Sequence, residues 1–325
     1  QGKPKSERRV LTLDTRSFSP QSLKGCIYKT ERLAVYDGPG IRTVVFLKGC
    51  PMSCIWCASP ESKSGKPEIG LKSELCTGCM ACADICPEQA VRVDRDGNIE
   101  FRRDQCRACG GCEEVCPSGA RTLIGEMVDA TDVVARLEKD EVFYHRSGGG
   151  ITLSGGDPVF QPSFSAAVLQ KSLERGFHTA METCAFCRWE VLETMLDHLD
   201  LVYMDIKHMD DRRHLELTGC PNTMILENIR NTTRQYADLE LVLRVPVIPG
   251  LNDEKDNMDG IMEFALALDH IKQIELLPYH RYGVASYPLV GKSYGLPDIE
   301  PPSPGRMQAL RERMEKSGIP VRIGG

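Results

Sequence analysis

The 325-residue sequence has neither a long apolar run nor an excess of positive charge. No stretch approaches the roughly twenty apolar residues that a membrane-spanning helix needs, and the polar segment 1–9 lacks the apolar core of a signal peptide. The formal net charge of −6 argues against nucleic acid as the main partner, because phosphate binding requires clustered lysine and arginine. We therefore expect a cytoplasmic protein with reduced thiols and with no membrane or nucleic-acid partner.

Cysteine, in contrast, is abundant. Of fifteen cysteines, eleven fall in three motifs between Cys50 and Cys116. The first motif consists of Cys50, Cys54 and Cys57 and has no fourth cysteine. Three thiolates can hold a four-iron cluster and leave one iron open, and an open coordination position can bind a small molecule. A zinc site would need a fourth ligand, and the nearest histidine in the sequence is His145, so we favour an iron-sulfur cluster.

The second and third motifs are two copies of one repeat. Each has three cysteines at intervals of three, followed by a fourth cysteine directly before a proline. This is the bacterial ferredoxin pattern, in which the first three cysteines hold one cluster and the fourth holds the other. A paired zinc site is the alternative, but a zinc ribbon needs only four cysteines. We expect two clusters, one held by Cys76, Cys79, Cys82 and Cys116 and the other by Cys106, Cys109, Cys112 and Cys86.

The length suits one large domain with a smaller insert. We expect an N-terminal arm over residues 1–30, a ferredoxin-like insert over 67–123, and a main domain formed by 31–66 and 124–325. About six alternating strand and helix signals in the main domain predict an α/β fold with a parallel sheet, whose site lies at the C-terminal ends of the strands. The expected strands are Thr43–Leu47, His178–Met181, Leu201–Ile206, Leu239–Val247, Gln273–Leu277 and Val321–Ile323, and the expected helices contain Phe164–Leu173, Leu192–Leu199 and Met307–Met314.

A longer motif precedes the first cysteines. The stretch Asp37-Gly-Pro-Gly40-Ile-Arg42, continuing through Phe46 to Cys50, resembles the signature of glycyl radical enzyme activating enzymes, which belong to the radical S-adenosylmethionine superfamily. The resemblance extends from about Tyr28 to the C-terminus, and a subgroup of that family carries two extra ferredoxin-type clusters. It implies a partial (β/α)6 TIM-like barrel with an inserted bacterial-ferredoxin-like domain that holds two [4Fe-4S] clusters.

The resemblance also implies an activity. The open iron held by Cys50, Cys54 and Cys57, the expected catalytic cysteines, would be chelated by the amino and carboxylate groups of S-adenosylmethionine. One electron from the cluster would then split the sulfonium bond and give a 5′-deoxyadenosyl radical. In this family the radical takes a hydrogen from a glycine of a partner glycyl radical enzyme, and glycine has no side chain to block the approach. The implied cofactors are three [4Fe-4S] clusters and S-adenosylmethionine, with ferredoxin or flavodoxin as the electron donor.

Three further segments resemble cofactor-binding motifs of the family. Thr152–Pro158 is similar to a Gly-Gly-Glu-Pro element, with Asp157 in place of the usual glutamate. A lysine-containing segment after the strand that begins at Leu201 is similar to an Asp-Leu-Lys motif, and Leu276–His280 is similar to a motif whose histidine contacts the adenosyl group. The implied S-adenosylmethionine contacts are Trp56, Cys57, Ala58, Gly155, Gly156, Asp205, Ile206, Lys207 and His280.

Other candidates have competing interpretations. In relatives, carboxylates at the positions of Glu182 and Asp205 help to hold a monovalent cation, whereas a surface salt bridge is the simpler alternative. Arg244 is a candidate contact to cofactor or partner, or else a buried ion pair at a strand end. Cys184 and Cys187 form an incomplete metal site, so we expect them to be ordinary thiols.

Two other classes of function are open to a sequence with these motifs. One is a radical S-adenosylmethionine enzyme that acts on a different peptide or a small molecule. The other is an electron-transfer module, but a ferredoxin has no need for the glycine-rich stretch before Cys50. Among the partners that relatives with this insert serve, general likeness favours isethionate sulfite-lyase. The insert could relay electrons or dock the partner.

Overall fold

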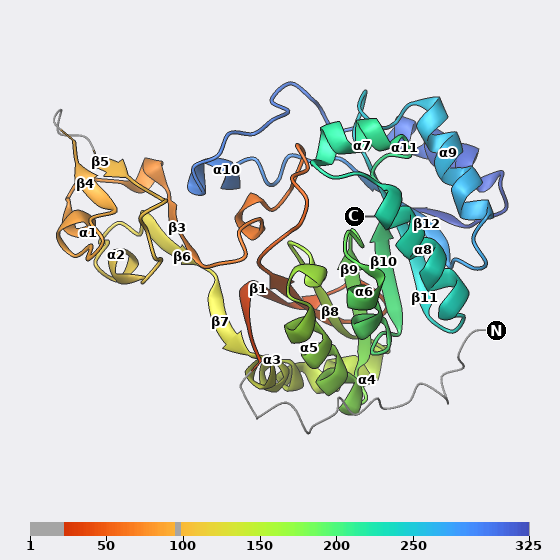
Figure 1. Cartoon of the computed structure of the whole chain (residues 1–325), viewed down its shortest axis with the longest axis horizontal. Helices are drawn as coiled ribbons and strands as arrows, with labels where there is room; N and C mark the ends of the chain where they lie inside the picture. Colours follow the sequence, from red (N-terminus) through yellow and green to blue (C-terminus); the bar gives the residue numbers. More distant parts are fainter. Residues whose placement is uncertain (1–22, 95–98, 325) are drawn as a thin grey trace.

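A nine-stranded sheet forms the centre of the main domain in the computed structural model, which describes residues 23–94 and 99–324 (Figure 1). The strand order is β7-β1-β2-β8-β9-β10-β11-β12-β13. All pairs from β2 to β13 are parallel, whereas β1 pairs antiparallel with both β2 and β7. The strands are β1 (Lys24–Ala34), β2 (Arg42–Leu47), β7 (Glu126–Asp129), β8 (Gly150–Gly155), β9 (His178–Thr183), β10 (Leu201–Asp205), β11 (Glu240–Val247), β12 (Gln273–Pro278) and β13 (Val321–Ile323).

The six strands expected from the sequence are all present, with ends that agree to within two residues. One expectation needs correction. The arm expected over residues 1–30 is in part a strand, because β1 begins at Lys24 and joins the sheet. Cys26 and Ile27 are buried, and the side-chain amide of Gln161 exchanges hydrogen bonds of 2.7 and 2.8 Å with the backbone of Cys26. These contacts fix the segment, and residues 1–22 lie outside the described part of the chain.

Helices connect the parallel strands and pack against one face of the sheet. Asp129, Asp210 and Ser303 each accept a hydrogen bond from a backbone N–H of the first helical turn, which stabilises the start of α3, α7 and α11. The expected helices are confirmed as α5, α6 and α11. The helices of the main domain are α3 (Ala130–Leu137), α4 (Glu141–Ser147), α5 (Pro162–Glu174), α6 (Trp189–Leu196), α7 (Asp211–Thr218), α8 (Thr223–Gln235), α9 (Lys255–Leu266), α10 (Ser286–Leu289) and α11 (Pro304–Glu315).

The two faces of the sheet differ in polarity because successive side chains of a strand point to opposite sides. The face against the helices belongs to a continuous apolar core. The other face has a small, separate apolar cluster, Ala180, Leu201, Tyr203 and Val242, and many polar side chains. Polar side chains on an inner face need partners there, since an unpaired buried polar group costs about 1–3 kcal/mol.

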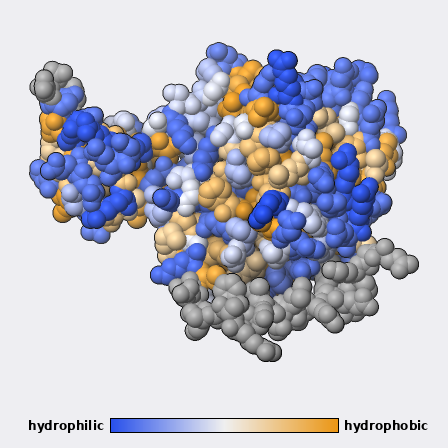
Figure 2. All heavy atoms as spheres, viewed as in Figure 1, coloured by the Kyte–Doolittle hydropathy of each residue, from blue (hydrophilic) through white to orange (hydrophobic). Residues whose placement is uncertain are grey.

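The insert forms a lobe that projects from the main domain in Figure 1. Its base is the antiparallel pair β3 (Glu68–Leu71) and β6 (Arg121–Ile124), and its outer part holds β4 (Val91–Val93), β5 (Ile99–Phe101), α1 (Ala81–Asp84) and α2 (Gly111–Glu114). The surface of the lobe in Figure 2 is largely hydrophilic. At its base, the buried Lys48 ammonium donates to the Glu68 carboxylate at 2.8 Å and to the Glu61 carbonyl at 2.7 Å, which ties the end of β2 to the start of the lobe.

No helix of the described ranges, 23–94 and 99–324, combines the length and the apolar character that a membrane crossing requires.

Arg42 holds the first strands of the sheet together from the inside. Its guanidinium donates to the Thr152 hydroxyl at 2.7 Å and to the carbonyls of Ile151, Pro39 and His178. The side chain is fully buried, and burial lowers its pKa to about 10, so it stays charged at neutral pH. The arginine of the signature motif therefore joins β2, β8 and β9.

We expect Arg42→Met to lower the free energy of unfolding by about 3 kcal/mol or more, because it leaves several buried acceptors without a donor. Arg146→Met on the exposed side of α4 is the control and should change stability by no more than about 0.5 kcal/mol. Anaerobic urea titration of both variants measures the difference. Equal effects of the two substitutions would show that the Arg42 contacts contribute little.

Candidate active site

A cavity of about 340 Å³ opens at the C-terminal ends of the parallel strands. Its wall includes residues that follow β2, β8, β9, β10, β11 and β12 in turn. Because strands at opposite ends of this series share one cavity, the sheet must curve around it. The volume is within the range of small-molecule sites, about 300–1,000 Å³. The sequence-predicted site residues on the wall are Cys50, Cys54, Trp56, Cys57, Ala58, Gly155, Gly156, Asp157, Glu182, Asp205, Lys207, Arg244 and His280. Cys184, expected to be an ordinary thiol, lies on the wall as well.

Ile206 is the exception among the expected cofactor contacts. Its side chain is buried in the apolar core instead of on the cavity wall. Its backbone N–H donates to the Arg244 carbonyl at 2.8 Å and continues the sheet by one residue. The central residue of the Asp-Ile-Lys segment thus positions its two charged neighbours.

Contacts from several parts of the chain hold the loop with the first three cysteines. The backbone N–H groups of Ser53 and Ile55 donate to the carbonyls at the end of α7, at 2.7 and 3.1 Å. The Tyr287 hydroxyl donates to the Cys57 carbonyl at 3.0 Å. The Lys63 ammonium donates to the Cys54 carbonyl at 3.3 Å. These hydrogen bonds fix the position of a loop that has no regular secondary structure.

Burial makes the thiols of Cys50 and Cys54 poor acids. It raises the pKa of Cys50, with Asp157 adding to the effect, and raises the pKa of Cys54 to about 11 although Lys207 opposes it. Free thiols of this kind stay protonated at neutral pH. Thiolate ligation by iron would therefore release protons, and three cysteines on one small loop fit a cluster that leaves one iron for another ligand.

Two glycines bring the end of β8 against the cysteine loop. A Cβ atom built on Gly156 would lie 2.2 Å from the Gly49 carbonyl oxygen, and one on Gly155 would lie 2.4 Å from the Leu47 nitrogen. Gly155 also has a φ of +107°, which favours glycine. The N–H of Gly156 donates to the Leu47 carbonyl and that of Asp157 to Gly49, each at 2.8 Å. Both glycines line the cavity, but close contact between backbones already requires them.

The carboxylate of Asp157 is occupied by hydrogen bonds within the protein. It accepts hydrogen bonds from the Thr183 hydroxyl at 2.8 Å, the Cys184 N–H at 2.8 Å and the Val159 N–H at 3.1 Å. Burial raises its pKa, and these hydrogen bonds oppose the shift. The aspartate that stands in place of the family's glutamate therefore fixes the end of β9, with little acceptor capacity left for a ligand. Cys184, directly beyond that strand, is buried on the cavity wall, and burial raises the pKa of its thiol.

Two cationic side chains face the cavity, and each is paired. The Lys207 ammonium is 2.6 Å from the Asp205 carboxylate. Arg244 donates to Glu182 and, at 2.7 Å, to Glu275, and its guanidinium carbon lies 3.7 Å from the centre of the Tyr203 ring. The expected candidates are thus ion pairs, as one interpretation predicted, but they lie inside the cavity rather than on the surface.

His280 lies at the edge of the cavity and is covered by an aromatic ring. Tyr282 stacks on it with ring centres 4.5 Å apart, and the Tyr282 N–H donates to Nδ1 of the histidine at 3.4 Å. Burial lowers the His280 pKa, so the ring is largely neutral at pH 7. Because Nδ1 accepts a hydrogen bond, the proton of the neutral ring is on Nε2, which can donate to a ligand.

The sequence did not point to Tyr287, Tyr203 or Glu275, which hold the cysteine loop and Arg244. Glu275 was detectable in principle, since it is a lone charge in an apolar strand. Tyr287 was not, because its partner, a backbone carbonyl, leaves no trace in the sequence.

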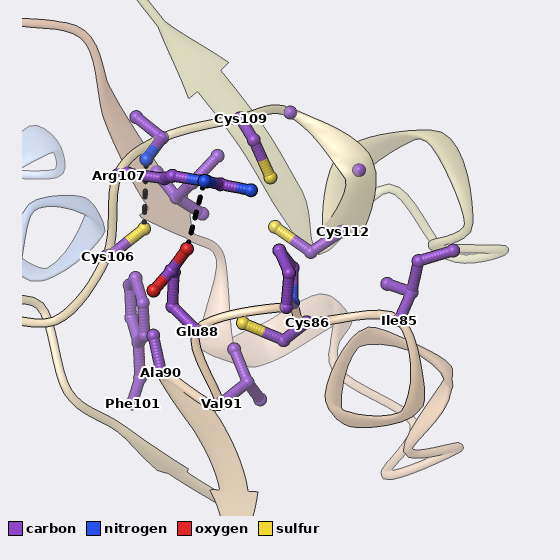
Figure 3. Close-up of a pocket in the computed structure, with 15 residues that line it drawn as sticks. Ile85, Cys86, Glu88, Ala90, Val91, Phe101, Cys106, Arg107, Cys109 and Cys112 are labelled. Atoms are coloured by element: carbon purple, nitrogen blue, oxygen red, sulfur yellow. Dashed lines mark hydrogen bonds and ion pairs between the residues drawn. The ribbon is translucent and has the colours of Figure 1, made fainter.

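In the lobe, the structure gathers the cysteines into two groups of four. Cys86, Cys106, Cys109 and Cys112 line one pocket, and Figure 3 shows their sulfur atoms around a common space. Cys76, Cys79, Cys82 and Cys116 line a second pocket. The groups, called here the inner and the outer quartet, have the crossed membership that the ferredoxin pattern predicts. The inner quartet is the nearer to the base of the lobe, since Ile69 of β3 lines its pocket.

The last cysteine of each repeat lies among backbone N–H groups. Burial raises the pKa of Cys86, but N–H groups of residues 88, 90 and 91 outweigh it, so that the pKa falls below its usual value. The pKa of Cys116 is lowered in the same way by N–H groups of residues 118, 120 and 121. Such groups favour the thiolate that an iron ligand must be.

The loops that carry the first three cysteines of each repeat have a strained backbone. Met80 and Ala108 have φ of +65° and +54°, a conformation that residues other than glycine rarely adopt. Gly78 and Gly110 occupy the corresponding positions of the other repeat with similar angles. The two repeats thus share the same strained backbone conformation, which agrees with loops that wrap around a ligand.

Asp37 of the signature motif approaches the polar inner face from the loop before β2. Its carbonyl accepts a hydrogen bond from Thr152 at 2.7 Å. Burial, with the charge of Glu182 as the next cause, raises the pKa of its carboxyl to about 6. This carboxyl is therefore close to half-protonated in mildly acidic solution.

Comparison with known proteins agrees with this geometry. Residues 108–261 match the model of the radical SAM superfamily, and residues 75–120 match the model of a 4Fe-4S dicluster domain. A structure of SuiB bound to the precursor peptide SuiA, from Streptococcus suis, covers 89% of this chain and 49% of its own, with a TM-score of 0.52 and 11% identity, which shows a shared fold only.

Three relatives are similar over most of their length. The isethionate sulfite-lyase activating enzyme of Oleidesulfovibrio alaskensis is 39% identical over 87% of this chain and 92% of its own. The indoleacetate decarboxylase activating enzyme of Tractidigestivibacter scatoligenes is 37% identical over 91% and 96%. The (2S)-3-sulfopropanediol sulfolyase activating enzyme of Bilophila wadsworthia is 40% identical over 85% and 92%.

The α/β domain and the cysteine-rich lobe thus define a radical S-adenosylmethionine protein with a ferredoxin-like dicluster domain. Within that superfamily, the chain belongs to the family of glycyl radical enzyme activating enzymes. The resemblance first suggested by the stretch from Asp37 to Cys50 is confirmed.

We expect Gly156→Ala to prevent stable packing of the first cysteine loop, because the added methyl group would meet backbone that cannot move aside. The variant should unfold at a clearly lower urea concentration and bind less iron than the parent. Gly305→Ala is the matched control: it lies in the first turn of α11 with open space around it, so the same change should be neutral or stabilise by up to about 1 kcal/mol. Normal iron content in Gly156→Ala would contradict the packing argument.

The raised pKa of Asp37 predicts a pH-dependent cost to stability. As pH rises, the unfolded carboxyl ionises near pH 4 but the folded one only near pH 6, so stability is lost across that window. Asp37→Asn should match the parent below pH 4 and become more stable by roughly 2 kcal/mol above pH 7. Unfolding titrations from pH 4 to 8 measure this difference, and a difference independent of pH would show that the Asp37 pKa is ordinary.

Proposed function

We propose that the protein activates a glycyl radical enzyme by removing a hydrogen atom from one glycine of that partner, with S-adenosylmethionine bound in the cavity. One observation carries the proposal. Three cysteines of one loop, one of them buried and two partly buried, and two ion pairs from neighbouring strands converge on a single cavity of small-molecule size at the C-terminal ends of the strands. The family membership supports the same reaction. We take the curved sheet from β2 to β12 as the family's partial (β/α)6 barrel.

Cys50, Cys54 and Cys57 would hold a [4Fe-4S] cluster with one open iron. When bound, this cluster and S-adenosylmethionine supply the one-electron chemistry that generates an adenosyl radical. The protein supplies placement. Glycines 155 and 156 keep the floor of the cavity free of side chains, and Trp56 and Ala58 lie on the wall beside the cysteines.

The charged residues suit the polar ends of the cofactor. Lys207 can donate to a carboxylate while Asp205 accepts from an amino group, and Nε2 of His280 can donate to a ribose or adenine acceptor at the cavity edge. The three groups lie on successive parts of one wall, so one extended ligand can meet them together.

Arg244 organises the carboxylates of the cavity. It bridges Glu182 and Glu275 and holds both carboxylates in place. We propose that Glu182 and Asp205 bind a monovalent cation. The Glu182 carboxylate accepts from Arg244 and, at 2.7 Å, from Ser154, and each of its oxygens keeps a lone pair for the cation.

We also propose that the inner and outer quartets each hold a [4Fe-4S] cluster, for three in all. The four cysteines around each pocket and the N–H groups at Cys86 and Cys116 support this. The lobe would then accept electrons from a ferredoxin or flavodoxin and pass them to the cavity. Arg103 supports such a role, since it joins the lobe to the Leu289 carbonyl, two residues beyond the tyrosine that contacts Cys57.

The identity of the partner enzyme is the most specific part of the proposal. We propose isethionate sulfite-lyase, because two relatives with 39% and 37% identity activate that enzyme by name. The sulfopropanediol sulfolyase relative at 40% identity makes that lyase the second candidate. The substrate of the partner enzyme does not bind to this protein. The residues of the cavity therefore do not indicate which partner is activated.

We expect a glycyl radical doublet in electron paramagnetic resonance when the reconstituted, reduced protein is mixed with S-adenosylmethionine and isethionate sulfite-lyase under anaerobic conditions. Sulfopropanediol sulfolyase and indoleacetate decarboxylase serve as rival partners in the same assay. Cys54→Ala should lose the doublet and all release of 5′-deoxyadenosine. Cys187→Ala, which removes a thiol that is not on the cavity wall, should retain both.

The outcomes separate the levels of the proposal. A doublet with a rival partner would correct only the partner. Steady 5′-deoxyadenosine release without a doublet in any mixture would move the reaction to another peptide or a small molecule. Activity in Cys54→Ala would refute the assigned site.

A further inference from the structure

Arg121 is a buried cation without hydrogen-bond acceptors for its terminal nitrogens. The residue is the first of β6 and is only 2% exposed. Neither Nη1 nor Nη2 has an acceptor in the described part of the chain. Leaving a buried charge without partners strongly destabilises a fold, so such a group is retained where something else accepts its hydrogen bonds.

The guanidinium lies between the two cysteine quartets. Arg121 lines the pocket of the outer quartet, together with Cys76, Cys79, Cys82 and Cys116. It also reaches the inner quartet, because its guanidinium lies on the ring of Phe101, which lines the pocket of that quartet. One cation is therefore close to both pockets.

An aromatic ring holds the guanidinium in place. The central carbon of Arg121 lies 4.5 Å from the centre of the Phe101 ring, and Phe101 itself lines the inner pocket. Arg103 lies 4.8 Å from the centre of the same ring. The cation–π contact with Arg121 is worth only about 0.5–2 kcal/mol, which does not replace lost hydrogen bonds to a charged group.

The two arginines on this ring differ in one respect. Arg103 donates to the carbonyls of Ile69 at 2.7 Å and Leu289 at 2.9 Å. Its hydrogen-bonding capacity is used by the protein, and its role at the base of the lobe is structural. Arg121 has the same ring contact, but its terminal nitrogens have no acceptor among the described residues, and it lines a pocket formed largely by cysteines.

We propose that Arg121 is a positioning residue that donates hydrogen bonds to sulfur atoms of the clusters in both quartets and raises their reduction potentials. The inference rests on the proposed occupancy of the quartets by [4Fe-4S] clusters. Reduction adds one electron to a cluster and breaks no bond, so it increases the negative charge around the sulfur atoms. A nearby buried cation stabilises the reduced form more than the oxidised form, and hydrogen bonds to sulfur act in the same direction.

The consequence is that the lobe holds electrons more readily than an apolar dicluster domain of the same size. Because one guanidinium serves both quartets, it shifts both potentials in the same direction.

The test is a redox titration of the full-length, three-cluster protein followed by electron paramagnetic resonance. Arg121→Met removes charge and donors with little change in volume, and both lobe clusters should shift to more negative midpoint potentials. The signal that changes on addition of S-adenosylmethionine identifies the cavity cluster, whose potential should not move. Arg92→Met is the matched control, because this lobe arginine is exposed, is paired with Glu100 at 2.6 Å and is screened by solvent, so its loss should shift neither potential.

Iron content distinguishes the possible failures. A parent protein whose lobe binds no clusters would refute the occupancy of the quartets but leave activation of a glycyl radical enzyme to be judged by its own assay. Unchanged lobe potentials in a fully loaded Arg121→Met would overturn the inference. If that variant folds but loses its clusters, Arg121→Lys decides: its shorter, single-point donor cannot serve both quartets, so at least one potential should fall, and potentials equal to the parent's would overturn the inference.

Discussion

The contact between the backbone of the first cysteine loop and the backbone at the end of β8 is the constraint on which the site depends. Two glycines at the end of β8 allow that contact, and backbone hydrogen bonds from Gly156 and Asp157 fix it. The loop can then present three thiols to the cavity without any regular structure of its own. The backbone of Asp157 takes part in this contact, and its carboxylate accepts hydrogen bonds from residues at the end of β9. A single junction thus orders three successive strand ends.

Charge is the second organising feature. The inner face of the sheet has few apolar residues, and each cation found there is balanced: Arg42 by carbonyls and a hydroxyl, Lys207 by Asp205, and Arg244 by two glutamates. Buried ion pairs of this kind contribute little net stability, because desolvation offsets most of their attraction. Their value is that they hold charged groups in defined positions before a polar ligand arrives, so that binding requires less reorganisation.

Much of this was visible in the sequence. The spacing of the lobe cysteines was sufficient to predict the crossed quartets, because it matches the bacterial ferredoxin pattern, in which the fourth cysteine of each repeat holds the other cluster. The parallel strands followed from short apolar runs that alternate with helical patterns. Strand β1 begins within the expected N-terminal arm, and its outer half is polar, which obscures it in the sequence. Alternation of side chains through the Asp-Ile-Lys segment places Ile206 in the apolar core. The partners of Arg244 and Cys57 are contacts between distant segments, which one sequence cannot show.

The segment that contains α10 touches both halves of the molecule. Tyr287 holds the carbonyl of Cys57, and the Leu289 carbonyl, two residues later, accepts a hydrogen bond from Arg103 of the lobe. The lobe is inserted in one place in the chain, but it is fitted to the main domain in two. A protein engineer who wished to transplant or remove this ferredoxin-like module would have to exchange residues 286–289 along with it. Homologous modules should therefore be interchangeable only as two-part units.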